Sequence, residues 1–151
     1  MDKRVLFVED DQSNFNTVSD IIHFIFPNWK IEPATTRQEA VDKAMQLLPD
    51  LIILDIALAD GRTGLAVVQD IARSSILKKP KIILVTALAN ESVPGLRSDR
   101  WLNQLSIEER ALVSDFFEKP FNTRQFMRSI ASALNIADSN SLQTIESIPD
   151  L

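Results

Sequence analysis

The chain has 151 residues, of which 45% are hydrophobic and 25% charged, a composition typical of one ordinary globular domain. Its formal net charge of −5 argues against a large surface for nucleic acid or for an anionic membrane. With no cysteine, disulfides and thiolate metal sites are excluded, and no apolar run is long enough for a signal peptide or a membrane span. We therefore expect a cytoplasmic protein without membrane insertion.

Short apolar runs along the chain predict strands. Because these runs do not alternate apolar and polar residues, they are typical of strands buried on both faces of a parallel sheet. In chain order the predicted strands are Val5–Val8, a weak one at Trp29–Pro33, Leu51–Leu54, Ile82–Val85, and a further weak one around Phe116–Phe117.

Helical patterns fill the segments between these strands. Thr36 with Glu39 and Ser106 with Glu109 form capping boxes, and Pro27 stops the first helical pattern. The predicted helices cover residues 14–26, Thr36 to Leu48, Leu65 to Ala72, Ser106 to Val113, and Asn122 or Thr123 to Leu134. This regular alternation of strand and helix predicts an open α/β sandwich with helices on both faces of the sheet.

Carboxylates follow two of the predicted strands. Glu9, Asp10 and Asp11 come directly after the first strand, and Asp55 ends the third. In doubly wound sheets ligands bind outside the carboxyl ends of the strands, so neighbouring strands would bring these acids into one crevice. Two unit charges about 4 Å apart repel by roughly 4 kcal/mol at an effective dielectric of 20, so the cluster stays ionised only beside a cation. Oxygen ligands favour a hard divalent ion such as Mg²⁺.

Simpler interpretations of each acid stay open. Asp11 can cap the first helix, and an aspartate at a strand end often starts a turn. Two further polar groups strengthen the hypothesis of a site, because Thr86 ends the fourth predicted strand and Lys119 follows the fifth. Carboxylates, a hydroxyl and an ammonium group at one sheet edge suit a phosphoryl group with its metal.

The blocks VLFVEDD, LIILD, IILVTA and FFEKPF, in this order over residues 4 to 135, resemble the signature blocks of the receiver domain of two-component response regulators. The resemblance implies a flavodoxin-like, doubly wound sheet of five parallel strands in the order 2-1-3-4-5. It also implies a domain over residues 1–137, similar to the single-domain chemotaxis regulators. We interpret residues 138–151, which are polar, acidic and without a helical period, as a mobile tail, with a partner-docking peptide as the alternative.

The resemblance also implies a function, a phosphorylation-controlled signalling switch. Asp55 would accept a phosphoryl group from a phosphohistidine on a sensor histidine kinase or a histidine phosphotransfer protein. Mg²⁺, with Mn²⁺ as a substitute, would be held directly by Asp10, through water by Glu9, and by Asp55 and the backbone carbonyl of Ala57. No enzymatic activity on an outside substrate is expected, only self-phosphorylation and slow hydrolysis of the phosphoryl group.

The same resemblance assigns a role to the other polar groups of the site. Lys119 would pair with one phosphoryl oxygen and Thr86 would hydrogen-bond another, while Phe116 would move inward on activation as a population shift. The signal would pass to a downstream protein target by protein contact rather than by direct binding of nucleic acid, and a homodimer is compatible with the family.

The sequence also departs from the family pattern. Ala59 replaces the usual proline, Gly64 comes one residue late, and an insertion around residues 90–110 puts the usual dimer contacts in doubt. Within it, Trp101, Leu102 and Leu105 form either an exposed partner site or core packing under a long loop. His23, the only histidine, could act as a relay, but we interpret it as structural, and we expect Trp29 to pack at the start of the second predicted strand.

Two other functions stay open. One is a binding module that keeps the fold without being phosphorylated, although all five site residues are present. The other is a phosphoaspartate enzyme, against which Ala57 stands where such enzymes carry an acid/base aspartate. Both a stand-alone regulator and the receiver part of a longer protein are compatible with the sequence.

Overall fold

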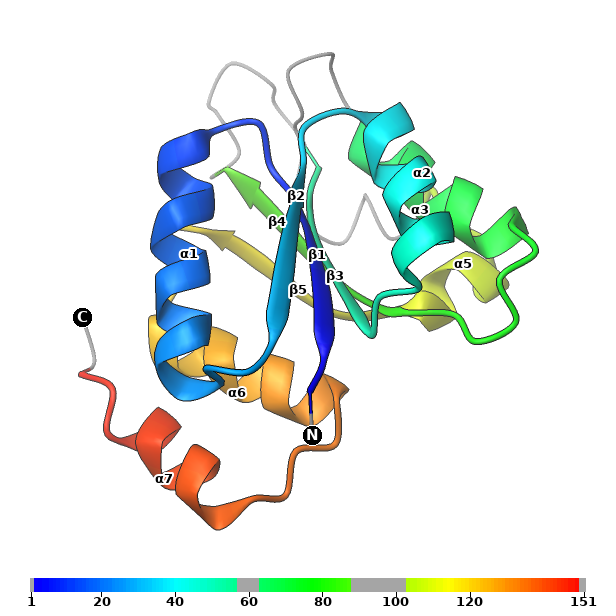
Figure 1. Ribbon diagram of the computed structural model, residues 1–151. Helices are drawn as coiled ribbons and strands as arrows, with labels where there is room; N and C mark the ends of the chain where they lie inside the picture. Colours follow the sequence, from blue (N-terminus) through cyan, green and yellow to red (C-terminus); the bar gives the residue numbers. More distant parts are fainter. Residues whose placement is uncertain (1, 57–62, 88–102, 150–151) are drawn as a thin grey trace.

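The fold is a five-stranded parallel sheet with helices on both faces (Figure 1). The computed structural model describes residues 2–56, 63–87 and 103–149. The strands follow one another across the sheet in the order β2-β1-β3-β4-β5, which confirms the predicted flavodoxin-like topology. Their bounds are β1 Arg4–Val8, β2 Lys30–Ala34, β3 Leu51–Asp55, β4 Lys81–Ala87 and β5 Val113–Lys119.

The helices divide into two layers. α2, α3 and α5 pack against one face of the sheet, whereas α1 and α6 pack against the other, and α7 packs on α1 and α6. Their bounds are α1 Gln12–Ile25, α2 Arg37–Leu47, α3 Thr63–Arg73, α5 Ile107–Leu112, α6 Thr123–Ala133 and α7 Ser139–Glu146. Among the described residues, none of these helices has the length and apolar character needed to cross a bilayer.

Coverage on both faces explains why the central strands are apolar at every position. In β1, Leu6 and Val8 belong to the core on the α2–α3 side, and Val5 and Phe7 belong to the core on the α1–α6 side. All five residues of β3 are buried, including Asp55 at its end. The strand that carries the candidate acceptor is therefore the most enclosed in the sheet.

The predicted caps lie where the sequence put them. Ser106 and Glu109 form a complete capping box at α5, and the Thr36 hydroxyl accepts a hydrogen bond from the amide of Glu39 at α2. The prediction that Val113 belongs to the helix was wrong. The amide of Val113 donates the last hydrogen bond of α5, to the carbonyl of Arg110. The residue itself already pairs with Ile82 as the first residue of β5.

Trp29 and His23, which we interpreted as structural, both make contacts that hold the fold together. Trp29 is buried and stacks on Phe26, with ring centroids 3.9 Å apart. The Nε2 atom of His23 lies 3.0 Å from the carbonyl oxygen of Trp29, so the imidazole ties the end of α1 to the start of β2.

The interpretation of residues 138–151 as a mobile tail was wrong for the part that the structure describes. Residues Ser139–Glu146 form α7, which Asp138 caps through the amide of Ser141. Ile145 is 1% exposed in the core on the α1–α6 side. This helix was not predicted because its eight residues carry few apolar side chains, and its stability comes from tertiary contacts.

Gly64, near the start of α3, is required by a close approach of two backbone segments. A Cβ atom at this position would lie 2.5 Å from the Cα of Ile56 and 2.6 Å from the carbonyl oxygen of Asp55. The Gly64 amide also donates a hydrogen bond of 3.3 Å to the carbonyl oxygen of Ile56. The start of α3 is thus held directly against the residues that follow β3.

We predict that Gly64→Ala lowers the free energy of unfolding by about 1 to 3 kcal/mol, because backbone atoms cannot move aside as a flexible side chain would. Urea unfolding followed by circular dichroism measures this loss. The control is Arg73→Ala at the exposed end of the same helix, expected to change stability by less than about 0.5 kcal/mol. Equal stabilities of the two variants would contradict the prediction.

Candidate functional site

The acidic residues meet at the carboxyl edge of the sheet. β1 and β3 are neighbours with Val8 opposite Leu54, so the residues that follow β1 lie beside the end of β3. Glu9, Asp10 and Asp55 each place a carboxylate oxygen within 4.8 Å of the others, an arrangement that could hold a metal ion. Glu9 and Asp55 are buried and Asp10 is exposed, so the cluster opens to solvent on the side of Asp10.

Asp11 does not belong to this cluster. Its Oδ1 atom accepts hydrogen bonds from the amides of Ser13 and Asn14, at 2.9 and 3.2 Å, and so caps α1. Of the two interpretations that the sequence left open for this residue, the helix cap is therefore correct.

Hydrogen bonds from the start of α1 fix the carboxylate of Glu9. Its Oε1 atom accepts from the side-chain amide of Asn14 and from the backbone amide of Asp11, both at 3.3 Å. The Glu9 amide donates to the carbonyl of Ala34 at the end of β2, 2.9 Å away. Asn14 therefore positions an acid of the cluster.

Asp55 is held by the centre of the sheet. It is 5% exposed and lies opposite Val85 of β4, and the next amide, that of Ile56, donates to the carbonyl of Val85 at 2.9 Å. Thr86, 7% exposed, follows Val85 at the same edge. The predicted contribution of the Ala57 carbonyl falls outside the described residues.

Lys119 supplies the positive charge of the cluster. Its Nζ atom lies 3.2 Å from Oε2 of Glu9 and 3.4 Å from Oδ2 of Asp55, and both carboxylates are nearly enclosed. Three carboxylates and one ammonium group leave a formal charge of −2. The oxygen-only donor set with this residual charge fits a hard divalent cation.

Two opposing effects act on the pKa of Lys119. Burial alone would lower it, but the charges of Asp55 and Glu9 and the hydrogen bonds to them together prevail, so the pKa lies above its ordinary value of 10.5. A pKa that is higher in the folded state means that these ion pairs stabilise the fold fully at neutral pH. Their contribution is lost only as the pH rises above 10.5 and through the raised pKa.

The neighbouring aromatic residues lie on opposite sides of β5. Phe116, the predicted switch residue, is half-buried against the core that α2, α3 and α5 cover. Phe117 packs on the other side against Phe126 of α6 and against Phe121, with ring centroids 5.3 and 5.7 Å apart. Phe121, next to the cis Lys119–Pro120 peptide, thus anchors the end of β5 to α6. This role was not predicted, and its place in the block FFEKPF was the one signal in the sequence that could have indicated it.

The insertion around residues 90–110 is described only in part. Trp101 and Leu102 lie outside the described residues. Leu105 is buried in the core under α2, α3 and α5, which confirms core packing for this residue.

The family profile of the response regulator receiver domain matches residues 5–96. The chain belongs to this family. The match includes Glu9, Asp10, Asp55 and Thr86, and the fold brings Lys119 of the receiver domain to them from beyond the matched segment.

Relatives of this receiver domain include longer regulators. The chain is 26% identical over 131 residues to the transcriptional regulatory protein TrcR of Mycobacterium tuberculosis, covering 87% of this chain and 45% of TrcR. The chain thus spans less than half the length of this relative.

Solved structures share the fold. The signal receiver domain of a candidate Luxo repressor protein from Vibrio parahaemolyticus is 26% identical, with a TM-score of 0.71 over 99% of this chain and 100% of that one. The signal receiver domain of a DNA-binding response regulator from Colwellia psychrerythraea is 21% identical, with a TM-score of 0.70 over 88% of this chain and 98% of that one.

We predict that Asp55→Asn lowers the pKa of Lys119, because one of its two charge partners is lost while burial remains. Titration of the lysine side chains by NMR measures this shift. The titration curves of the other lysines should coincide in the two proteins, and an unchanged Lys119 curve would mean that Asp55 contributes no attraction.

Proposed function

We propose that this receiver domain accepts a phosphoryl group on Asp55 from a phosphohistidine of a sensor histidine kinase or a histidine phosphotransfer protein. The observation that carries the proposal is the buried Asp55 carboxylate, 3.4 Å from the Lys119 ammonium and clustered with Glu9 and Asp10. An Asp55 oxygen would form a bond to phosphorus while the bond from phosphorus to the imidazole nitrogen breaks, and that nitrogen keeps the electron pair.

The acidic residues around Asp55 support a role for a divalent cation, which we propose to be Mg²⁺, with Mn²⁺ as a substitute. Asp10 and Asp55 would hold the ion directly and Glu9 through water, together with the predicted Ala57 carbonyl. Such an ion supplies neutralisation of the charge on the transferring phosphoryl group. Glu9 is positioned for this by its hydrogen bond from Asn14.

Lys119 would exchange one partner for another during the reaction. It pairs with the Asp55 carboxylate before phosphorylation, and we propose that it then pairs with a phosphoryl oxygen, which carries more negative charge. The Thr86 hydroxyl would donate to another phosphoryl oxygen. The contacts of Thr86 and Lys119 would exist in one conformer only and would shift the population towards it, with Phe116 moving inward.

The output that we propose is protein contact with a downstream target, in the cytoplasm. Catalysis would be limited to the domain's own phosphorylation and the slow hydrolysis of its phosphoryl group. The net charge of −5 supports this in preference to direct binding of nucleic acid by the chain itself.

Phosphorylation of Asp55 can be tested with a small donor. We predict that the purified chain gains one phosphoryl group from acetyl phosphate and Mg²⁺, seen as an increase in intact mass, because the carboxylate is held beside Lys119. The increase should be abolished by EDTA. The control is Asp55→Asn, which keeps the shape of the side chain but removes the nucleophilic charge, and a mass gain in this variant would contradict the assignment of the acceptor.

The metal assignment has its own test. Asp10→Asn should weaken Mg²⁺ binding by about tenfold or more, because one formal charge is removed from the ligand set. Titration of the amide resonances with Mg²⁺ measures the affinity. The matched control is Asp11→Asn, the next residue in the chain, which can still cap α1 and should change the affinity far less. Equal losses in the two variants would contradict the assignment.

A further inference from the structure

An apolar groove runs along α1 and α6 and ends at the candidate site. It has a volume of about 550 Å³ and is lined by Val18 and Ile21 of α1, by Phe121 and Phe126, and by Lys119. Because the Lys119 ammonium lies 3.4 Å from Asp55, this groove adjoins the proposed acceptor. A protein that delivers a phosphoryl group to Asp55 can therefore use its walls for apolar contact.

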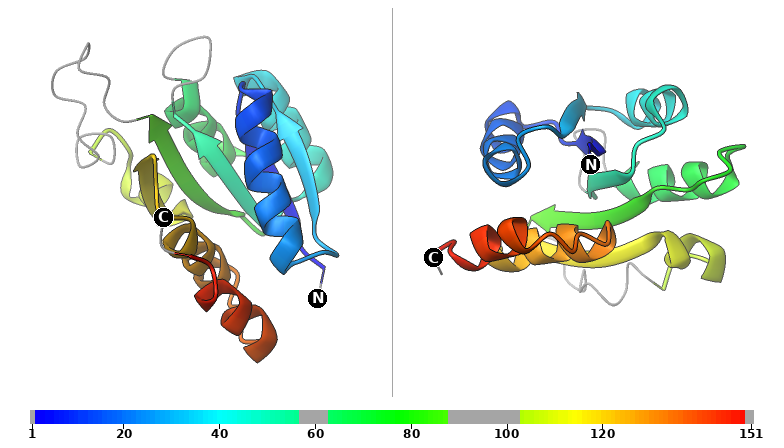
Figure 2. Two further views of the ribbon diagram at one scale, coloured as in Figure 1. Left: turned by 90° about the vertical axis from the view of Figure 1, so that its left-hand side faces the viewer. Right: turned by 60° about the horizontal axis from the view of Figure 1, so that its bottom comes forward.

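Helix α7 already occupies the neighbouring part of this α1–α6 face. Its Ile145 is 1% exposed and packs in the same core as Val18 and Ile21. The chain continues to Ile148, which is partly buried in that core. Figure 2 shows α7 lying along α6. The α1–α6 face thus accepts a helix, and the one that it holds belongs to the chain itself.

Two arginines of α6 hold the end of α7. The Nε and Nη2 atoms of Arg124 donate to the carbonyl oxygen of Ile148, at 3.0 and 2.6 Å. Arg128 forms a two-pronged ion pair with Glu146, whose side chains are 50% and 53% exposed. An ion pair with this much exposure is screened by solvent and salt and contributes little stability.

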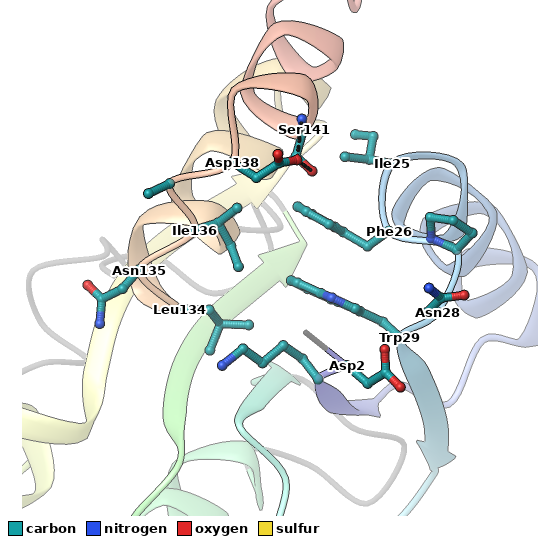
Figure 3. A pocket seen from close by; sticks show the side chains of 13 residues that line it. Asp2, Ile25, Phe26, Asn28, Trp29, Leu134, Asn135, Ile136, Asp138 and Ser141 are labelled. Atoms are coloured by element: carbon teal, nitrogen blue, oxygen red, sulfur yellow. Dashed lines mark hydrogen bonds between the residues drawn. The ribbon is translucent and has the colours of Figure 1, made fainter.

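The beginning of α7 is attached less closely. A cavity of about 440 Å³ lies between the turn that joins α1 to β2 and the segment that leads into α7 (Figure 3). Phe26 and Trp29 line one side of it, and Asp138 and Ser141 line the other. Leu142, one turn before Ile145, is 38% exposed. Attachment therefore depends mainly on Ile145, on Ile148 and on the hydrogen bonds from Arg124, with a small contribution from the Arg128–Glu146 ion pair.

A helix held in this way can leave as a unit. The eight residues of α7 are too few for a stable helix in isolation, so release from the face would also unfold it. Docking and helix formation of α7 are then a single equilibrium, and only a few contacts stabilise the docked state. Such an equilibrium can be shifted by a protein that competes for the same face.

We propose that α7 is a displaceable strap on the α1–α6 face, and that it restricts docking of the phosphohistidine-bearing protein at the groove beside Lys119. The inference rests on the proposed function. While α7 is docked, Ile145 and Ile148 cover the part of the α1–α6 face that lies next to the groove. Release of α7 extends the apolar surface along α6, and the donor binds there more readily.

Release of α7 can be measured with cysteine chemistry, because the chain contains no natural cysteine. Ile145→Cys places a thiol at the buried position of α7, so the rate of its reaction with an aromatic disulfide reagent reports how often α7 leaves the face. Ser139→Cys gives the reaction rate of an exposed thiol in the same helix. Arg128→Glu, which repels Glu146, should speed labelling at position 145 by about fivefold. The charge-reversed pair Arg128→Glu with Glu146→Arg should restore slow labelling.

The effect on docking is measured by the rate of phosphorylation from two donors. The first is acetyl phosphate, which needs no docking surface, and the second is a purified histidine phosphotransfer domain phosphorylated on its histidine. Without the added cysteines, Arg128→Glu should accept phosphate from the protein donor about fivefold faster than the wild type, at an unchanged rate from acetyl phosphate. The charge-reversed pair keeps Glu at position 128, so its return to the wild-type rate would separate release of α7 from a direct effect of the charge on α6.

Each other result has one meaning. Unchanged labelling at position 145 in Arg128→Glu, or equal protein-donor rates with α7 docked and released, would overturn the strap. So would a lack of transfer from the protein donor to every variant while acetyl phosphate labels Asp55, a result that leaves the proposed function intact. Failure of acetyl phosphate in all variants would instead count against the proposed function, whatever the labelling of α7 shows.

Discussion

The structure depends on the balance of charge at the carboxyl edge of the sheet. Buried carboxylates are costly unless they are paired, and Glu9 and Asp55 are both nearly enclosed. The ammonium group of Lys119, 110 positions from Glu9 and 64 from Asp55, lies within hydrogen-bonding distance of both. The strand order produces this meeting, because β3 lies beside β1 and β5 brings its lysine to the same edge. The remaining negative charge would attract a divalent cation, which in turn would offset the charge of a phosphoryl group.

The surrounding structure keeps these groups in place. Helices on both faces enclose β3, so that Asp55 emerges from a buried strand. Gly64 lets α3 approach the backbone next to Asp55, and Asn14 of α1 fixes Glu9. Asp55 and its neighbours are thus positioned by elements from the whole domain, and a phosphoryl group on Asp55, as proposed, would bias several of them at once.

The α1–α6 face differs from this rigid centre. The site is fixed by the sheet, whereas α7 is held by the buried Ile145, by Ile148, by half-buried hydrogen bonds from Arg124 and by the exposed ion pair of Arg128. A domain that is built in this way can keep its chemistry constant while access to it changes. A stable sheet that holds the site, together with a short helix that is attached by few contacts, allows access to the site to be controlled without a change in the site itself.

Local patterns in the sequence were enough to predict the strands, the caps at Thr36 and Ser106 and the acids at the strand ends, because unbroken apolar runs and capping boxes are local signals. The strand order came from the resemblance of four short blocks to a family. The contacts in the fold were needed to show that Asp11 caps α1 instead of joining the cluster, that Val113 begins β5, and that Lys119 pairs with two acids. They were also needed to show that α7 is a helix, since Ile145 is buried only where α1 and α6 meet. These features depend on contacts between segments far apart in the chain, which no local pattern records.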